Sequence, residues 1–448
     1  MGRCMENALN RFFKIEESGS TVRTEIVAGV TTFMTMAYII FVNPAILSQG
    51  AGMDFNAVMV ATCISAAAAT MLMALLANYP IAQAPGMGIN ALFSYQICAS
   101  MGVPWNIALG MVFLSGVLFI LLTVVKLREV IFEAIPEGIK HGIAAGIGTF
   151  IAFIGLKEAG IVVPNASTFL TMGDLSTTPA LVAIAGLLLT AVMMARRIKG
   201  AILLGIFCTG ILGVITGLVE YKGLVSPIPS LDPTWLKLDI TGALSAAFIM
   251  PIFTILFLNM FDTIGTLIGV GEQAGLVING TLPRAGRALF SDAVGTTLGS
   301  LCGTSPLTSY IESATGVSEG GRTGLTSVIT ALLLLLSLFF SPLAIMFGGG
   351  YRGEGCPTLL HPITAPALIV VGSLMMQSII KIRWTAPDEA IPAFLTIVTM
   401  PLTFSISNGL AIGFVSYPVI KLGCGKGNEV HWMVYLVSAL LIALYLIA

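Results

Sequence analysis

Two carboxylates interrupt long apolar stretches of this chain. Asp262 is the only charged residue within 240–271, and Glu312 lies between the uncharged stretches 293–311 and 323–351. A carboxylate in such surroundings can accept charge-assisted hydrogen bonds from the N–H groups of a ligand. Because desolvation disfavours its ionised form, it can also take up a proton and release it later. The chemistry that these positions suggest is therefore ligand binding and proton transfer.

The surroundings of both acids favour function over a structural role. A charge at the centre of a membrane-spanning helix costs at least ~2.5–3.5 kcal/mol, so acidic residues there are usually functional. A structural ion pair is the competing explanation for Asp262, but the neighbouring apolar stretches contain no Lys or Arg that could pair with it. The same reasoning applies to Glu312, which also follows the helix-breaking residues Gly303 and Pro306.

Other polar residues allow more than one interpretation. Asn90 and Asn259 are cheaper to bury than a charge, and each fits an interhelical hydrogen bond as well as a ligand contact. Asp292 lies near Arg284 and Arg287 at the start of an apolar segment. That position predicts a helix cap or a surface ion pair instead of a binding site.

Several ionisable residues stand at the ends of apolar segments. Lys157 and Glu158 are expected at a membrane face, and His141, His361 and His431 at the interface with water. The sequence contains neither HExxH nor GxGD, and its seven cysteines form no CxxC pair. We therefore expect no enzyme activity, no metal site and no organic cofactor. Because the two carboxylates can take up and release a proton, the expected coupling ion is H+.

The composition requires a membrane around these residues. Of 448 residues, 56% are hydrophobic and 10% are charged, against about 25% charged in a soluble domain. Residues 55–125 carry no charge, and ~20 apolar residues suffice to span a bilayer. We predict an all-α polytopic membrane protein. Lys and Arg gather before the first span and in alternate loops, which places the N-terminus in the cytoplasm. The sequence has no basic stripe of the kind that binds nucleic acid, so we expect no nucleic-acid partner.

The two halves of the chain are related. At an offset of 226 residues, TMLMALLANYPI (70–81) matches TTLGSLCGTSPL (296–307). We expect about fourteen spans, one of them short or broken near 401–408. With seven spans in the first half, the second half must enter the membrane from the opposite side. Such inverted repeats are typical of secondary transporters, which bind substrate at the membrane midplane on discontinuous helices.

Both halves are interrupted at corresponding places. Glycine and proline break the stretches YPIAQAPGMGINALFSY (79–95) and GTSPLTSYIESATGV (303–317). Irregular backbone at membrane depth is tolerated only where protein buries it or water solvates it. A half-helix that begins near Gly88 or Glu312 aims free N–H groups at a ligand. We therefore expect a site where the two interruptions meet. The small residues of GIAAGIG (142–148) predict close helix packing.

Four motifs carry a resemblance to a known family. In this order, they are TTFMTMAYIIFVNPAIL (31–47), APGMGINA (84–91), FDTIGTLIGV (261–270) and TSYIESATGV (308–317). Together they closely resemble the hypoxanthine/guanine/adenine permease family, a purine-specific branch of the xanthine/uracil permease superfamily of nucleobase–cation symporters. The resemblance covers essentially the whole chain.

The resemblance implies an architecture. It implies two inverted repeats of seven spans, with short strands and half-helices in spans 3 and 10, usually in a homodimer. A core domain would comprise 1–130 (spans 1–4) and 236–350 (spans 8–11). A gate domain would comprise 131–235 (spans 5–7) and 351–448 (spans 12–14). The core would move against the gate in an elevator-like cycle.

The resemblance also implies the site. Asp262, followed by Thr263, Ile264 and Gly265, matches the acidic residue of span 8 that holds the nucleobase. Glu312, followed by Ser313, matches the residue of span 10 that binds the edge of the base. In the third span, Asn90 stands where this branch has a polar residue for purines. The implied substrate-binding set comprises Asp262, Glu312, Asn90, Gly88, Asn259 and Ser313.

The proton-coupling role falls on the same two acids. Asp262 is favoured as the proton carrier and Glu312 as the anchor of the base, but these roles can be exchanged. Two features depart from uracil-type relatives: Asp replaces Glu in span 8, and ESATGV has one residue more before its Gly-Val. The shorter acid leaves room for a bicyclic purine.

These observations predict import of purine nucleobases across the cytoplasmic membrane by proton symport. A transporter of the same fold for uracil, xanthine or an inorganic anion is the alternative. Anion transporters of this architecture usually lack an acid at the span-10 site, so Glu312 counts against that alternative. A channel or an intramembrane enzyme is a further alternative. A channel, unlike a symporter, would not accumulate substrate against a gradient.

Overall fold

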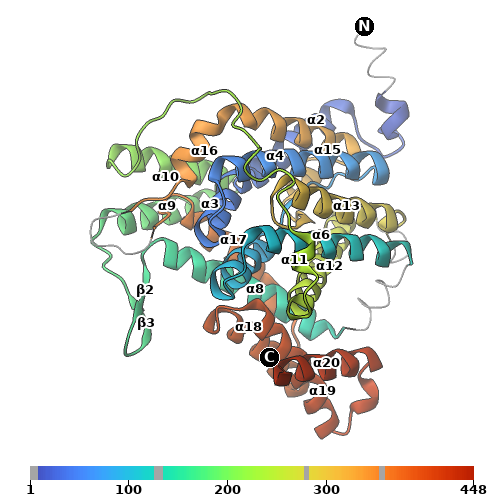
Figure 1. The fold of residues 1–448 in the computed structure, drawn as a ribbon. Helices are drawn as coiled ribbons and strands as arrows, with labels where there is room; N and C mark the ends of the chain where they lie inside the picture. Colours follow the sequence, from blue (N-terminus) through green and yellow to red (C-terminus); the bar gives the residue numbers. More distant parts are fainter. Residues whose placement is uncertain (1–8, 126–134, 277–281, 353–358, 448) are drawn as a thin grey trace.

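The computed structural model is a bundle of helices (Figure 1), and two of the short β-strands in its described residues pair within the bundle. It describes residues 9–125, 135–276, 282–352 and 359–447. The elements of its first half are α2 (Val22–Met36), α3 (Ile39–Ala51), α4 (Phe55–Leu72), η1 (Met73–Ala77), β1 (Gln83–Pro85), α5 (Met87–Ala91), η2 (Leu92–Ser100), α6 (Trp105–Val124), α8 (Glu137–Glu158), β2 (Val162–Asn165), β3 (Phe169–Met172), α9 (Thr178–Ala195) and α10 (Ala201–Ile215).

The second half repeats this plan of helix, short strand and short helix. Its elements are α11 (Ile240–Ala243), η3 (Ala246–Phe248), α12 (Ile249–Gln273), α13 (Ala285–Cys302), β4 (Leu307–Ser309), α14 (Ser313–Ser318), α15 (Gly324–Leu336), η4 (Ser337–Phe340), α16 (Ser341–Gly348), α17 (Ala365–Met375), η5 (Met376–Lys381), α18 (Pro387–Leu402), α19 (Ile406–Gly423), η6 (Gly427–Glu429) and α20 (Trp432–Ile447).

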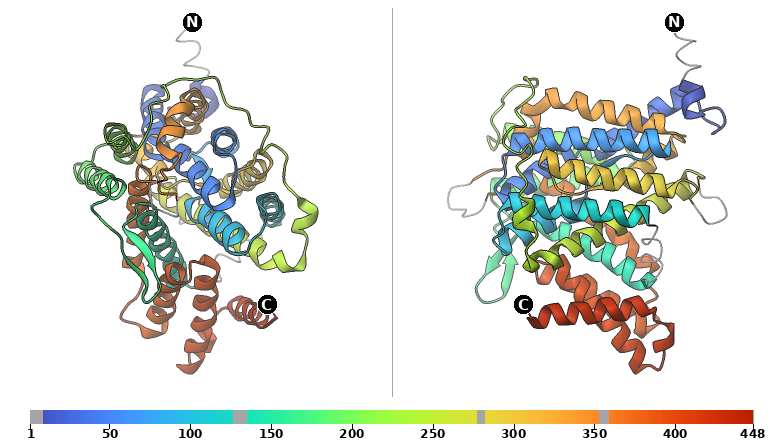
Figure 2. Two further views of the ribbon diagram at one scale, coloured as in Figure 1. Left: turned by 60° about the vertical axis from the view of Figure 1, so that its left-hand side comes forward. Right: turned by 45° about the vertical axis from the view of Figure 1, so that its right-hand side comes forward.

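Length and composition of the helices confirm a polytopic membrane protein. Within the described ranges, seven helices are long and apolar enough to cross a bilayer, and three shorter apolar helices accompany them. In Figure 2 (right) most helices run in similar directions, with the β2–β3 hairpin and the N-terminal helix at opposite ends of the bundle. Helix α18 ends at Leu402 and α19 begins at Ile406, and the two helices pack on each other, so the chain turns between two helices at the position near 401–408 where one short or broken span was expected.

The two interrupted segments meet through their strands. Strand β1 pairs antiparallel with β4, and Gln83 lies opposite Ser309. These two residues are separated by 226 residues, which is the offset that relates the two halves of the sequence. Equivalent positions therefore face each other, as expected for inverted repeats related by a two-fold axis. The prediction of short strands and half-helices in spans 3 and 10 is confirmed.

Local sequence explains why both helices stop before the strands. The helix of α4 and η1 ends at Asn78 and α13 ends at Gly303, and both of these residues adopt the left-handed conformation. This conformation is the common C-terminal cap of a helix. Pro80 and Pro306 follow within three residues and lack the N–H that a continuing helix needs. Each strand then leads into a new short helix, α5 or α14.

The helices pack in two groups. In the first, α13 packs on α4 and α6, and α15 packs on α2 and α4, around the strand pair. In the second, α8 packs on α17 and α18, and α9 packs on α10. The glycines of GIAAGIG allow the second group to pack closely, because a Cβ on Gly148 would lie 2.7 Å from the carbonyl oxygen of Gly372. The close helix packing predicted for this stretch is confirmed.

Candidate functional site

Asp262 lies on α12 beside the crossing of the two strands. Its side chain is half-buried. A Cβ built on Gly86, directly after β1, would lie 3.5 Å from Oδ2 of Asp262 and 3.0 Å from the hydroxyl oxygen of Thr308 on β4. Only a glycine fits between these groups without displacing them. The carboxylate therefore lies against the start of α5, whose first N–H groups have no partner within the helix.

Glu312 lies directly before α14 and is also half-buried. The Tyr38 hydroxyl donates a hydrogen bond of 2.6 Å to its Oε1 atom. The ring of Tyr38 lies 6.5 Å from that of Tyr310, whose hydroxyl donates to the backbone carbonyl of Pro85. Two tyrosines thus link the carboxylate to the end of β1. Sequence reasoning missed Tyr310, although it stands two residues before Glu312.

The site is open on the side of α14 and closed on the side of α5. Ile311 is 54% exposed and Ile268 is 41% exposed, and a Cβ on Gly265 would meet nothing within 4 Å. In contrast, all five residues of α5 are buried. The opening therefore lies along the C-terminal half of α12. It runs toward the end of the bundle where Lys199 pairs with Glu319 at 2.6 Å.

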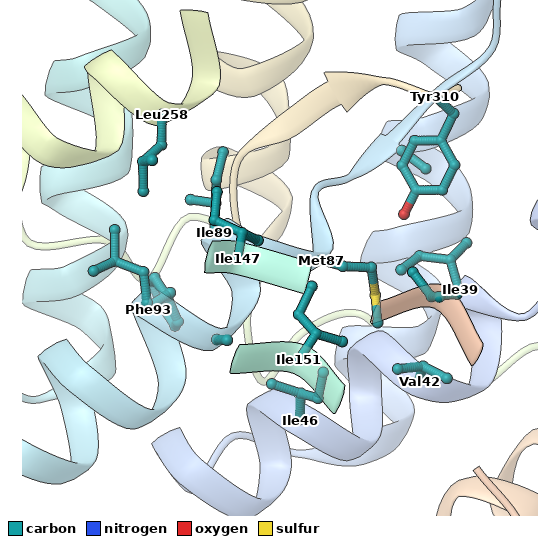
Figure 3. Packing of buried hydrophobic residues seen from close by; sticks show 14 of the residues in the cluster. Ile39, Val42, Ile46, Met87, Ile89, Phe93, Ile147, Ile151, Leu258 and Tyr310 are labelled. Carbon is teal, nitrogen blue, oxygen red and sulfur yellow. The ribbon is translucent and has the colours of Figure 1, made fainter. Parts of the chain in front are cut away.

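Gly88 lies at the closed side, where α8 of the second helix group crosses α5. A Cβ on Gly88 would lie 2.5 Å from Cγ2 of Ile147, so the Ile147 side chain packs directly on the backbone of Gly88. Figure 3 shows Ile147 and Ile151 packed among Met87, Ile89 and residues of α3. This apolar contact separates the two carboxylates from the hairpin end of the bundle.

Asn90, Asn259 and Ser313 make structural contacts around the site. Asn90 accepts a hydrogen bond from Ser305 through Oδ1, while its Nδ2 has no hydrogen-bond partner among the described residues. The Asn259 amide donates to Thr296 on α13 at 2.9 Å. Ser313 accepts a hydrogen bond of 3.0 Å from the backbone of Ala82. All three are buried, and the amide nitrogen of Asn90 is a donor without a hydrogen-bond partner among the described residues.

The expectation for Asp292 was wrong. Its side chain is completely buried in the strand crossing instead of lying in a surface ion pair. Gln83 donates to its Oδ1 atom at 3.0 Å, and the Ser309 hydroxyl lies 3.5 Å from the same oxygen. Asp292 thus ties β1 and β4 to α13. The proximity of Arg284 and Arg287 in the sequence was misleading, because the side chain points inward from the helix.

Two further residues are more deeply buried than the sequence suggested. Glu158 and His361 were expected at a membrane face, but they are only 2% and 1% exposed. They adjoin each other at the end of the bundle that carries the β2–β3 hairpin, with Tyr95 against Glu158. Sequence reasoning missed this because the two residues are 203 positions apart and belong to different segments.

In the described part of the chain, neither a cavity nor a cluster of metal-binding side chains provides a second candidate site. A cavity of about 280 Å³ lies between apolar side chains of α2, α10 and α15, among them Phe33, Phe207 and Leu333, away from both carboxylates. No group of three or more His, Cys, Asp and Glu residues that could hold a metal ion occurs there. The two half-buried acids at the strand crossing therefore remain the candidate site.

Comparison with known proteins gives consistent matches over nearly the whole chain. The model of the Permease family (Xan_ur_permease) matches residues 23–412. The adenine permease AdeP of Escherichia coli is 43% identical and covers 98% of this chain and 96% of its own. The guanine/hypoxanthine permease PbuO of Bacillus subtilis is also 43% identical, over 96% of this chain and 98% of its own.

A solved structure shares the fold. The transmembrane domain of the bicarbonate transporter BicA from a cyanobacterium superimposes with a TM-score of 0.63 and covers 86% of this chain and 97% of its own. Its sequence identity is 15%, so the likeness concerns the fold alone.

The contact between α5 and α8 generates a testable prediction. Gly88→Ala should destabilise the protein by ~1–3 kcal/mol, because the added methyl group overpacks against Ile147. The double variant Gly88→Ala/Ile147→Ala should recover part of this loss, since the second change makes room. Thermal unfolding of the purified protein in detergent measures both effects.

Gly265→Ala is the matched control, because its Cβ meets nothing within 4 Å and the position is helical. It should be neutral or slightly stabilising. Equal destabilisation by Gly88→Ala with and without the Ile147 change would contradict the close approach of α5 and α8.

Proposed function

Because this chain belongs to the Permease family (Xan_ur_permease), we propose that it is a secondary transporter that imports purine nucleobases. The observation that carries the proposal is the pair of half-buried carboxylates at the strand crossing of a permease. The names of AdeP and PbuO support adenine, guanine or hypoxanthine as the substrate class. Family membership also makes a transporter, and not an enzyme, the expected activity.

Glu312 is the proposed anchor of the base. A purine presents ring N–H donors beside acceptors on one edge, and a carboxylate can accept from two adjacent N–H groups. Tyr38 occupies one lone pair of Oε1, which leaves acceptor capacity on both oxygens of Glu312. Its position before the short helix α14 places the carboxylate on the open side of the crossing. A base entering along α12 would meet it there.

Asp262 is the proposed proton carrier. No basic side chain makes an ion pair with it among the described residues. A carboxyl group that loses water can be neutralised by a proton at lower cost than it can be buried as an ion. One proton moving through 100 mV carries ~2.3 kcal/mol. That energy supports roughly 50-fold accumulation of a neutral substrate.

The proposed cycle moves the first helix group, the core, against the second group, the gate. The open side at α14 and the closed side at α5 support one end state of such a movement. The positive charge in alternate loops supports a cytoplasmic N-terminus, and with that orientation the open side faces inward and the β2–β3 hairpin lies outside. The family resemblance supports a homodimer in the cell membrane.

An inorganic anion is the second candidate substrate, because the fold resembles that of a bicarbonate transporter. An uncompensated carboxylate at the site would repel an anion, whereas it accepts hydrogen bonds from a nucleobase. Glu312 and Asp262 therefore favour the purine.

Uptake into vesicles tests the function. We expect accumulation of radiolabelled adenine, guanine or hypoxanthine that a proton uncoupler abolishes, with weaker uptake of xanthine and uracil. Excess bicarbonate should not compete. Uptake of bicarbonate but of no purine would support the anion instead, and accumulation that resists the uncoupler would dispose of proton coupling.

Asp262→Asn should insert in the membrane but lose accumulation, because the amide cannot carry a proton. Purine exchange across the vesicle membrane, which needs no coupling, should persist. Glu272→Asn on the exposed end of the same helix is the control and should accumulate purine normally. Uncoupler-sensitive accumulation by Asp262→Asn at the wild-type level would show that another group carries the proton.

Glu312→Gln should lower purine affinity by ~2–4 kcal/mol, or roughly 30- to 1,000-fold. The amide can still accept from Tyr38, but its NH2 group then faces the N–H of the base. Glu312→Asp keeps the charge and should have a milder effect, and Glu272→Gln should have none. Calorimetry with hypoxanthine and the purified proteins measures all three. Equal affinities throughout would mean that Glu312 is structural.

A further inference from the structure

Another buried carboxyl group, that of Glu158, joins the core to the gate at the hairpin end. Glu158, the last residue of α8, belongs to the gate, and Gln49 on α3 and Tyr95 on η2 belong to the core. The Tyr95 oxygen lies 2.5 Å from Oε1 of Glu158 and 2.8 Å from Oε1 of Gln49. Glu158 and Tyr95 are 2% and 6% exposed. The tyrosine thus bridges the two helix groups.

If Glu158 is ionised, the Tyr95 hydroxyl lies between two acceptor oxygens, those of Glu158 and Gln49, and has a proton for only one of them. The Gln49 amide donates through Nε2 to the carbonyl oxygen of Leu359 at 3.0 Å, so its Oε1 faces Tyr95. A tyrosine hydroxyl has one proton and cannot donate to two acceptors at once. Exchanging the oxygen and nitrogen of the amide only moves the conflict to Leu359.

A proton on Glu158 completes the chain. Glu158 then donates to the Tyr95 oxygen, Tyr95 donates to Gln49, and Gln49 donates to Leu359. Each of the three contacts, Glu158–Tyr95, Tyr95–Gln49 and Gln49–Leu359, then has one donor and one acceptor.

The neighbouring ionisable groups do not replace this proton. His361 Nδ1 lies 3.9 Å from Oε2 of Glu158, beyond hydrogen-bond distance, and neither ring nitrogen has a hydrogen-bond partner among the described residues. Lys157 Nζ lies over the rings of Tyr95 and Phe404, at 5.6 and 5.1 Å from their centres. It makes no ion pair with Glu158 within the described ranges. Burial of an unpaired carboxylate would be costly.

We propose that Glu158 is a second proton-binding site, protonated where the core and gate are closed at the hairpin end and ionised where they separate. The protonation rests on geometry alone, whereas its link to opening rests on the proposed movement of the core. The proton comes from water outside and returns to it, so this site regulates closure and does not carry the transported proton.

The sign of the pH dependence follows from this assignment. The closed state binds one proton more than the open state, so it is favoured at low external pH and lost as the pH rises. For one proton, the ratio of open to closed changes by at most about tenfold per pH unit.

Ile151 provides a reporter of this opening. It lies on α8 seven residues before Glu158, is 1% exposed and packs against the core (Figure 3). In a chain whose own cysteines are replaced, Ile151→Cys should react with an impermeant maleimide added from the hairpin side only when the core moves away. We expect its labelling rate, divided by the rate of an exposed thiol at the same pH to correct for the thiolate fraction, to increase with external pH by up to tenfold per unit.

The variant Glu158→Gln distinguishes closure by a protonated Glu158 from closure by an ionised Glu158. Its amide can donate to the Tyr95 oxygen without a proton from solvent, so labelling should stay slow and the corrected rate should lose its pH dependence. Asp174→Asn, an exposed acid in the loop after β3, is the control and should keep the wild-type pH dependence. Faster labelling of Glu158→Gln at every pH would overturn the proposal, because it would mean that the charge closes the contact.

Infrared spectroscopy tests the proton directly, without substrate. The difference spectrum of wild type minus Glu158→Gln at neutral pH should contain the carbonyl band of a protonated carboxyl group, and that of wild type minus Asp174→Asn should not. Absence of this band in a protein that transports purines overturns the proposal. Its presence in a protein that transports no purine would contradict the proposed function and leave Glu158 as a proton-binding site.

Discussion

Every peptide group inside a membrane must find a hydrogen-bond partner within the protein, and the fold of this chain depends on that constraint. After the helices that end at Asn78 and Gly303, the chain continues as extended backbone that neither lipid nor a helix can satisfy. The two interruptions satisfy each other by pairing β1 with β4. A hydrogen bond from buried Gln83 on β1 to buried Asp292 on α13 reinforces the pair. This pairing requires two equivalent extended segments at the same depth of the bundle, and an inverted repeat provides them.

The strand crossing also decides where chemistry is possible. Each strand leads into a short helix whose first N–H groups lie at membrane depth, and each short helix stands beside a carboxylate. The two sides are nevertheless unequal in this conformation. Packing of Ile147 against Gly88 closes the side of α5, while the side of α14 stays open beside Ile311. The two halves of the core are related by symmetry, but the helices around them cover only the α5 side. A transporter that exposes one site alternately to the two sides of a membrane requires such an unequal arrangement.

The contact that closes the hairpin side combines two kinds of interaction with different consequences. The apolar part around Ile147 and Ile151 excludes water and does not respond to pH. The polar part at Tyr95 and Glu158 holds the same two helix groups, but it is complete only with a proton. A closure built in this way can be sensitive to external pH although the substrate site itself lies elsewhere.

The sequence by itself determined the membrane-spanning class, the repeat, the two interruptions, and Asp262 and Glu312, because unpaired charge and broken periodicity inside apolar stretches are visible in one dimension. It could not place side chains whose partners are distant in the chain. Asp292 seemed superficial beside two arginines, and Glu158 and His361 seemed interfacial at segment ends, yet all three are buried. Burial is decided by which helices pack together, and the partners of these residues come from the other half of the chain or from the other helix group. Only the tertiary structure brings them into contact.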